Sequence, residues 1–162
     1  MSGKEVAEML EEGNRRLQAF STVGATLAGR PYASGKWTFA QILGHVADAD
    51  TVCYTRLHQA IVEPSGTLFP VPMDGELWVE ALLCAERPVD VSLAAIQGAR
   101  VGMVHTLRTL PGEVLLKQLI HEEMGEVTPL QYARISAEHG IHHVAQLESI
   151  QEASIQEHGA MQ

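Results

Sequence analysis

The sequence predicts an all-α protein built as a four-helix bundle. Four long segments carry apolar residues at intervals of three and four, which is the spacing of one buried helix face. No segment shows the convincing apolar and polar alternation of a half-buried strand. Two of the four segments also begin with the residues of a capping box. Four such helices bury their apolar faces against one another, and functional sites in these bundles are built from inward-facing side chains on adjacent helices.

The first amphipathic segment runs from about Lys4 to Leu27 and stops at Gly29-Arg30-Pro31. The second segment has a clear start at Thr38, with Gln41 three residues later to complete a capping box and Trp37 just before it as a staple residue. It continues to about Val62. Its apolar stripe consists of Phe39, Ile42, Leu43, Val46, Ala49, Cys53 and Leu57.

The second connection contains Pro64, Gly66, Pro70 and Pro72, which makes it too rich in proline for a helix or a central strand. A short extra helix is expected in the same connection, near 76–85. The third long segment starts around Asp90, a plausible N-cap, and ends at Pro111-Gly112. Its apolar residues are Leu93, Ile96, Val101, Val104 and Leu107.

Residues 114–127 mix apolar and polar side chains, and the pattern leaves a helical turn and an extended hairpin equally open. The last segment begins with Thr128 as cap, Pro129 at the first helical position and Gln131 closing the box. We expect this helix to reach about Ser154.

Composition limits the classes of function. The 162 residues suit one domain, which we expect to cover residues 1–155 with a frayed tail at 156–162. Hydrophobic residues make up 46% and charged residues 19%, which argues against disorder. The net charge is -9, with no basic cluster. Such a surface repels phosphate backbones, so we expect a small-molecule substrate and no nucleic-acid partner.

We expect a soluble, cytoplasmic protein. The stretch 1–12 carries acidic residues where an export signal needs an apolar run, and no apolar run approaches the roughly 18–20 residues of a membrane span. Two cysteines, Cys53 and Cys84, are too few for a disulfide framework. Cys53 fits a buried small hydrophobe better than the alternative, a reactive thiol.

Eight histidines in this acidic chain direct attention to metal binding, because histidine is the commonest metal ligand. His139 and His143 are four residues apart in a helix, so they lie about 40° apart on one face and one turn apart along the axis. His142 points about 100° away from His143 and is treated as a neighbour. Two imidazoles form only a partial site, since a transition metal normally needs a third protein ligand from another element.

His45 is the candidate for that third ligand. It interrupts the apolar stripe of the second segment, and Gly44 leaves room beside it. Asp48, one turn further on, can orient the His45 ring as a carboxylate partner; the alternative is a solvated helix charge. For each histidine the alternative to a ligand is a core residue satisfied by a hydrogen bond.

Other catalytic motifs fail on inspection. The sequence His121-Glu122-Glu123-Met124-Gly125 begins like a zinc-protease helix, but glycine stands where the second histidine belongs. No phosphate-binding glycine loop and no Gly-x-Ser-x-Gly elbow occurs. Zinc-protease, nucleotide-hydrolysis and serine-hydrolase chemistry therefore have no support.

Two motifs together resemble a known family. Trp37-Thr38 leads into Gln41-Ile42-Leu43-Gly44-His45-Val46-Ala47-Asp48, and the last helix holds Glu138-His139, His142-His143 and Gln146-Leu147. Their order and separation resemble the DinB-like superfamily, the DinB/YfiT type of metal-binding four-helix bundle. The resemblance implies an up-down-down-up bundle, often a homodimer. It also implies one divalent metal, commonly nickel or zinc, on His45, His139 and His143.

The resemblance further implies a metal-dependent transferase that activates a low-molecular-weight thiol such as bacillithiol or mycothiol. A metal lowers the pKa of a bound thiol and holds a thiolate at neutral pH, so the protein needs no nucleophile of its own. Asp48, His142 and Gln146 are candidates for positions around the ligands, and Arg56 is a candidate contact for a carboxylate of the thiol. The catalytic group itself would be metal-bound water or thiol.

Two alternatives stay open. In the first, a structural metal staples the second and fourth helices of a non-catalytic, stress-related binding or assembly protein, with Asp48 or Glu138 closing the site. In the second, the histidines only pack and form hydrogen bonds. The sequence does not choose among zinc, nickel, copper and iron, since imidazole suits all four.

Overall fold

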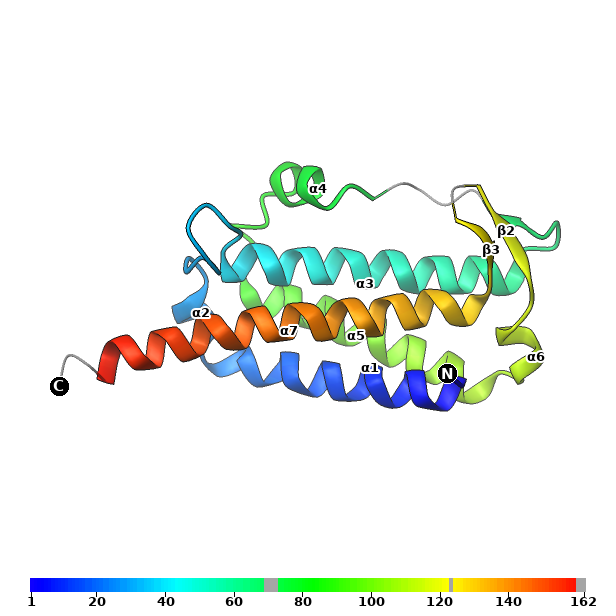
Figure 1. Ribbon diagram of the computed structural model, residues 1–162, viewed down its shortest axis with the longest axis horizontal. Coiled ribbons are helices and arrows are strands. Elements are labelled where there is room, and N and C mark those ends of the chain that lie inside the picture. Colours follow the sequence, from blue (N-terminus) through cyan, green and yellow to red (C-terminus); the bar gives the residue numbers. More distant parts are fainter. Residues whose placement is uncertain (69–72, 123, 160–162) are drawn as a thin grey trace.

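Four long helices lie side by side along one axis in the computed structural model, which describes residues 1–68, 73–122 and 124–159 (Figure 1). Two of them, α1 and α7, run in one direction, and the other two, α3 and α5, run in the opposite direction. This arrangement confirms the predicted four-helix bundle and its up-down-down-up order. The helices are α1 (Gly3–Gln18), α3 (Phe39–Val62), α5 (Val89–Thr109) and α7 (Pro129–Gly159).

Each long helix packs mainly against two others: α1 and α3 both contact α5 and α7. The core consists of two apolar clusters, one toward each end of the bundle. Leu10, Leu57 and Met103 belong to one cluster, whereas Leu17, Ile42 and Ile96 belong to the other. None of the helices in the described ranges is long and apolar enough to cross a membrane.

The predicted start of α3 is confirmed. Thr38 accepts a hydrogen bond from the backbone N–H of Gln41, whose side chain accepts from the backbone of Thr38. At the start of α7, the backbone N–H of Thr128 donates to the Gln131 side chain, as the sequence indicated. A further capping box, formed by Ser2 and Glu5, begins α1.

Three predicted helix boundaries need correction. The first segment is not one helix to Leu27, because α1 ends at Gln18 and is followed by a 3₁₀ turn, η1 (Ala19–Thr22), and by α2 (Gly24–Leu27). The N-cap of α5 is Pro88, so Asp90 lies in the first turn instead of capping it. The last helix continues to Gly159, beyond the expected end at Ser154 and into the tail that was expected to fray; residues 160–162 lie outside the described ranges.

The bend after α1 has a packing cause. A side-chain carbon at Gly24 would come within 2.6 Å of Val89, so the chain passes the start of α5 at a distance that only glycine permits. Nearby, the ring of Phe20 meets Phe39 edge to face with centroids 5.3 Å apart. These contacts turn the chain toward α3.

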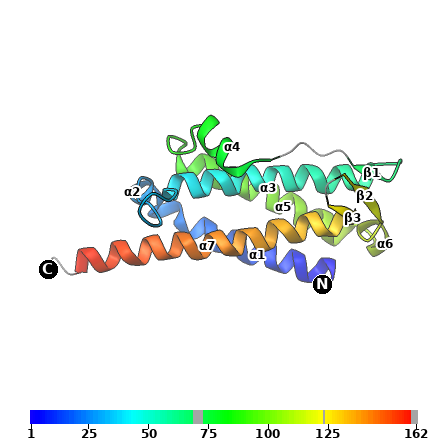
Figure 2. The same cartoon turned by 45° about the horizontal axis from the view of Figure 1, so that its top comes forward.

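The connections carry short elements. Residues 114–127, which the sequence left undecided, contain both alternatives: the end of α6 (Gly112–Leu115) and a hairpin of β2 (Leu119–His121) and β3 (Gly125–Val127). From the proline-rich connection, β1 (Thr67–Leu68) adds to the edge of this hairpin, parallel to β2; Pro70 and Pro72 are outside the described ranges. The expected short helix is α4 (Gly75–Ala81), and it lies along α3 (Figures 1 and 2).

A layer of buried polar groups separates the two apolar clusters. Nε of Arg100 on α5 donates to Oδ2 of Asp50 on α3 at 2.6 Å, and the hydroxyl of Ser136 on α7 donates to Oδ1 of Asp50 at 2.6 Å. The Arg100 and Asp50 side chains are fully buried. Gly13 on α1 and Gly140 on α7 leave the space that the guanidinium occupies. The layer therefore joins all four long helices.

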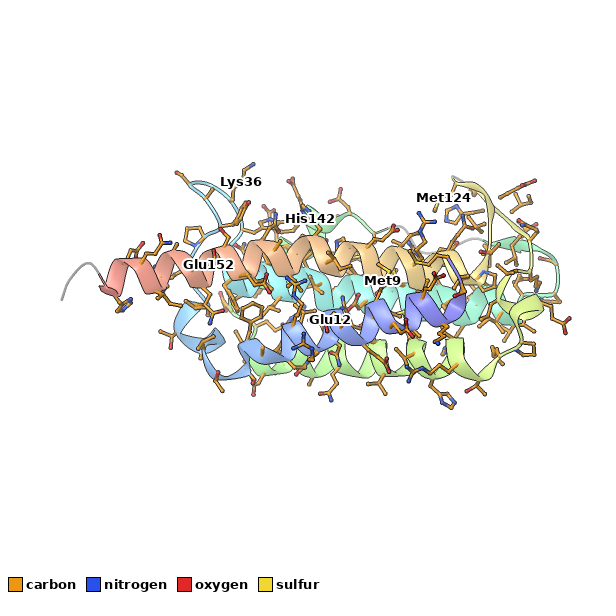
Figure 3. The ribbon with its side chains drawn as sticks, turned by 60° about the horizontal axis from the view of Figure 1, so that its bottom comes forward. Met9, Glu12, Lys36, Met124, His142 and Glu152 are labelled. Atoms are coloured by element: carbon orange, nitrogen blue, oxygen red, sulfur yellow. The ribbon has the colours of Figure 1, made fainter. Side chains whose placement is uncertain are left out.

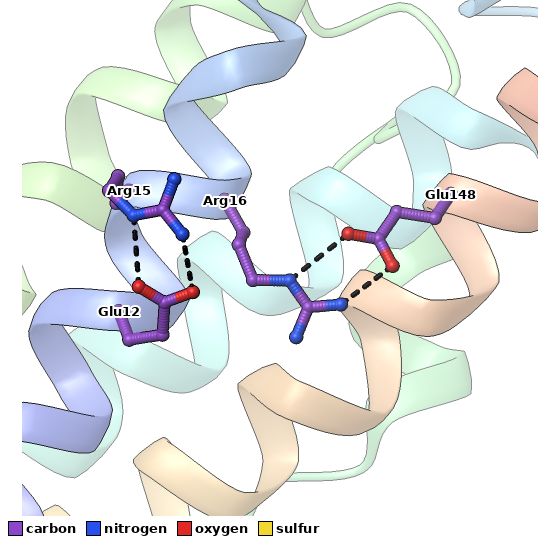
Figure 4. Close-up of polar contacts among 4 residues, drawn as sticks. All are labelled: Glu12, Arg15, Arg16 and Glu148. Carbon is purple, nitrogen blue, oxygen red and sulfur yellow. Dashed lines mark hydrogen bonds and ion pairs between the residues drawn. The ribbon is translucent and has the colours of Figure 1, made fainter.

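Surface ion pairs add a weaker connection between α1 and α7. Arg16 of α1 makes a bidentate contact with Glu148 of α7, at 3.0 Å through Nε and 2.6 Å through Nη2 (Figure 4). Beside it, Arg15 pairs with Glu12 of the same helix. Such exposed pairs contribute little, typically about 0–1 kcal/mol, so the buried layer carries more of the specificity of helix pairing.

The tight packing of this polar layer predicts that one added methyl group at Gly140 destabilises the protein. In Gly140→Ala, the new carbon would lie 2.0 Å from Nη2 of Arg100, whose buried side chain cannot withdraw without disturbing its contact with Asp50. We expect a loss of roughly 2–4 kcal/mol in the free energy of unfolding, measured by urea denaturation. The matched control is Gly98→Ala, because Gly98 is exposed on α5 with nothing within 4 Å of a new carbon. It should gain about 0.5–1 kcal/mol, and equal effects of the two variants would contradict the tight contact.

Candidate metal centre

The structure brings His45, His139 and His143 together between α3 and α7. Nε2 of His139 lies 3.0 Å from Nε2 of His45 and 3.0 Å from Nε2 of His143. The possible ligand atoms of the three side chains all lie within 4.8 Å of one another. One residue comes from α3 and two come from α7, so the cluster spans two antiparallel helices.

Local structure fixes each ring. One helical turn separates His139 from His143, which puts both rings on the face of α7 that meets α3. The ring of His45 packs against Trp37, with centroids 4.8 Å apart. Gly75, at the start of α4, covers the other side: a side-chain carbon there would come within 2.8 Å of the His45 ring. Glycine at this position allows the α4 backbone to rest on the imidazole.

Gln146 orients one ligand. Its Oε1 accepts a hydrogen bond from Nδ1 of His143 at 2.7 Å. A proton on Nδ1 leaves the lone pair on Nε2, the atom that faces the cluster, so this hydrogen bond selects the tautomer that binds a metal. Gln146 thus lies beside the histidine cluster and contacts one of its rings.

Asp48 does not take the orienting position that the sequence proposed for it. Its two carboxylate oxygens accept hydrogen bonds from Arg87 at 2.9 and 3.1 Å, and Nδ1 of His45 is buried with no partner among the described residues. The reason is that Arg87, which follows α4, reaches the same face of α3. Asp48 acts on His45 only through its charge, which opposes the lowering of the His45 pKa.

His142 lies outside the cluster. Its side chain projects from the exposed face of α7 (Figure 3), and only its ring edge approaches His143, with centroids 5.1 Å apart. Elsewhere, His58 contacts the Thr106 hydroxyl at 3.0 Å, and His121 lies in β2. Within the described ranges, the histidines that come together are therefore His45, His139 and His143.

Burial keeps the cluster uncharged. Desolvation, followed by the nearby charges of His143, His45 and Arg100, lowers the pKa of His139 to about 3. Burial lowers the pKa of His143 to about 4, although the hydrogen bond that its Nδ1 donates to Gln146 acts in the opposite direction. The pKa of His45 is lowered as well, again mainly by burial. Neutral imidazole is the form that binds metals, so the site is electrostatically prepared for a cation.

The donor set and its spacing fit a divalent transition metal. Zinc–nitrogen bonds of about 2.0–2.1 Å in a tetrahedron place two ligand nitrogens roughly 3.3–3.4 Å apart, so the 3.0 Å pairs need only small shifts. Among residues 1–68, 73–122 and 124–159, no fourth His, Cys, Asp or Glu joins the group. Asp48 is held by Arg87, and Glu138 is held by Arg134 at 2.8 Å. Neither closes the site as the stapling alternative requires.

A pocket of about 350 Å³ opens on the cluster. His143 and Gln146 form part of its wall, and the side chains of the connection before α3 and of the first turn of α4 complete it. The lining residues are Tyr32, Gly35, Lys36, Trp37, Ile42, Glu76, His143 and Gln146. Of the three clustered histidines, His143 is the one that lines this pocket, so a small molecule in it lies against the cluster on that side.

Arg56 does not line this pocket. It borders a separate one of about 280 Å³ together with Asp48 and Trp78 on another face of α3. Both cysteines are buried, as the sequence indicated for Cys53, and burial raises the pKa of Cys53 to about 12 and raises that of Cys84. Neither thiol is available as a thiolate at neutral pH.

The fold and the three-histidine cluster define a class, the four-helix bundle with a metal site between its helices. The sequence profile of the DinB superfamily matches residues 9–147, and the chain belongs to this superfamily. A relative from Bacillus cereus (strain 03BB102), named "Putative metal-dependent hydrolase", is 31% identical over 90% of this chain and 82% of its own. One from Bacillus mycoides (strain KBAB4), with the same descriptive name, is 31% identical over 92% of this chain and 84% of its own.

Two solved structures share the fold. YfiT from Bacillus subtilis, described as "a probable metal-dependent hydrolase with an unusual four-helix bundle topology", superposes with a TM-score of 0.81 and 23% identity, covering 94% of this chain and 87% of its own. TT2238, a four-helix bundle protein, superposes with a TM-score of 0.63 and 19% identity, covering 91% of this chain and 99% of its own.

The lowered pKa values predict how stability depends on pH in the metal-free protein. In the unfolded chain, histidines bind protons below their ordinary pKa of 6.5. In the native state, His139 and His143 stay neutral until the pH reaches their lowered pKa values of about 3 and 4. The free energy of unfolding therefore has its full value, as far as these two rings are concerned, above pH 6.5, and it falls as the pH decreases toward 4. We expect a loss of roughly 1–2 kcal/mol per ring between pH 7 and pH 5, measured by urea unfolding with a chelator present.

The control is the double variant His139→Gln, His143→Gln, which lacks both rings and should lose less stability over the same interval. If the parent protein and the double variant were to lose the same amount, the two rings would not be the groups responsible.

Proposed function

We propose that this protein is a metal-dependent enzyme that holds one divalent cation, zinc or nickel, on Nε2 of His45, His139 and His143. The observation that carries the proposal is the set of three neutral imidazoles with no fourth protein ligand among the described residues, facing a pocket. A site with three protein ligands and an open position is typical of catalysis, whereas structural sites are closed by four. The names of the relatives support the same conclusion.

The nucleophile comes from outside the chain. No serine, threonine or cysteine lines the pocket, and both cysteines are buried with raised pKa values. A divalent cation at this site lowers the pKa of a bound water or thiol and acts as a Lewis acid toward the substrate. Gln146 holds His143 in the ligating tautomer, and Trp37 with Gly75 shields the His45 ring from water.

We infer that a low-molecular-weight thiol is the nucleophile and that the reaction is its transfer to a small electrophile. The family resemblance supports this assignment, which needs no general base or nucleophile from the protein. Hydrolysis, with water in place of the thiol, is the second candidate because the relatives are named as hydrolases. Both reactions use the same three histidines.

The location, assembly and extent of the domain stay predictions: a cytoplasmic homodimer with one domain at 1–155. Both cysteines are free thiols, in agreement with a reducing compartment. Val91 and Val101 on α5 are exposed and offer apolar surface to a second copy.

Metal analysis tests the site itself. We expect the purified protein, loaded with Zn²⁺ or Ni²⁺ and dialysed, to retain one equivalent, and His143→Ala to retain less than about a tenth, since two imidazoles form only a partial site. The matched control is His142→Ala, which removes a neighbouring but exposed ring and should keep full occupancy. If His143→Ala kept the metal while His142→Ala lost it, the ligand assignment would be wrong.

An activity assay separates the two candidate reactions. The metal-loaded protein is mixed with 1-chloro-2,4-dinitrobenzene and 2-mercaptoethanol, and separately with 4-nitrophenyl acetate and no thiol. In the first reaction a carbon–sulfur bond forms, chloride leaves and the thiol proton passes to the buffer; in the second, water cleaves the ester. We expect metal-dependent turnover only with the thiol. Metal-dependent hydrolysis without thiol-dependent turnover would instead support the hydrolase.

A further inference from the structure

Two side chains of opposite charge stand unpaired at the pocket over the metal centre. Lys36 and Glu76 both line it and are both exposed. The nearby carboxylates Asp48 and Glu138 are held by arginines, but neither Lys36 nor Glu76 belongs to any ion pair found within the described ranges. The pocket thus offers one free cation and one free anion to whatever binds there.

The backbone holds these two charges in place. Lys36 lies in a closed turn, in which Pro31 bridges to Thr38 and the backbone N–H of Tyr32 donates to the carbonyl of Trp37 at 3.0 Å. Figure 3 shows the Lys36 side chain at this turn, beyond the bundle surface. Glu76 follows Gly75, whose backbone rests on the His45 ring. Lys36 therefore comes from the connection before α3 and Glu76 from the first turn of α4, and backbone contacts hold both segments beside the histidine cluster.

The remaining walls complement both charges. Tyr32 and Trp37 supply aromatic faces, which attract ammonium groups as Glu76 does. Gln146 uses its Oε1 to accept from His143, so its amide N–H groups stay available to a carboxylate alongside Lys36. A volume of about 350 Å³ is near the lower end of ligand pockets, which suits a small polar molecule.

We propose that this pocket selects a zwitterionic small molecule, one that carries an ammonium and a carboxylate group as an α-amino acid does. Glu76 and the aromatic rings bind the ammonium group, and Lys36 with Gln146 binds the carboxylate, while a third substituent extends toward the cluster at His143. The inference rests on the proposed function, because it assigns the substrate class of that same site. A doubly anionic ligand is disfavoured by Glu76, and a doubly cationic one by Lys36.

The test uses four thiols with the same two-carbon thiol unit: L-cysteine, cysteamine without the carboxylate, 3-mercaptopropionate without the ammonium group, and 2-mercaptoethanol, which has a neutral hydroxyl group in place of both. Each is titrated into Co²⁺-loaded protein, and the dissociation constant is read from the thiolate-to-cobalt absorption band. Metal content is measured afterwards, so that binding is distinguished from removal of the ion.

The expected result is a charge-matched pattern. Lys36→Gln should weaken binding of L-cysteine and 3-mercaptopropionate by roughly three- to tenfold and leave cysteamine unchanged. Glu76→Gln should weaken L-cysteine and cysteamine by a similar factor and leave 3-mercaptopropionate unchanged. Neither variant should affect 2-mercaptoethanol. Each comparison sets a variant against the parent protein with the same thiol. Differences in how the four thiols chelate cobalt therefore cancel.

The matched control is Glu80→Gln, an exposed carboxylate on α4 outside the pocket, which should leave all four constants unchanged. If both pocket variants left every constant unchanged, or shifted all four equally, the zwitterion proposal would be overturned while thiol binding at the metal stood. If no thiol bound to protein that holds a full equivalent of Co²⁺, the proposed thiol chemistry would fail, and this assignment with it.

Discussion

The buried contact between Arg100 and Asp50 is the constraint on which the arrangement of the bundle depends. Both side chains are fully buried, and the Ser136 hydroxyl completes the contact from a third helix. A buried charge without its partner typically costs about 3–5 kcal/mol. A shift of one helix along another would separate Arg100 from Asp50, so it costs more free energy than the same shift between two purely apolar faces. Gly13 and Gly140 make the contact possible, because larger residues would occupy the space of the guanidinium.

The same layer holds the metal centre. His45 precedes Asp50 by five residues on α3, and Ser136 precedes His139 by three residues on α7. The hydrogen bond between Asp50 and Ser136 therefore fixes the relative height of the two helices that supply the imidazoles. The Arg100 charge also contributes to the low pKa of His139. One set of contacts thus fixes the helix register and prepares neutral ligands for a cation.

In the proposed function, the connections between the helices determine which small molecule the pocket accepts. The pocket walls come largely from the turn before α3 and from the first turn of α4, and both pack against His45 through Trp37 and Gly75. Segments of this kind tolerate change better than a packed helix does. A common bundle can keep its metal site while the connections define which small molecule reaches it.

The sequence by itself determined the local features: the four helices, the capping box at Thr38, and the one-turn spacing of His139 and His143, because these depend on neighbours within a few residues. The apolar stripe of the second segment also pointed to His45 as the third ligand, and the family resemblance implied the same residue. Only the tertiary structure decided the polar layer, the pairing of Asp48 with Arg87 and the pocket. Arg100 was not among the core positions that the apolar pattern of the third segment predicted. Its partner stayed hidden, because which helix faces which is settled by packing between residues far apart along the chain.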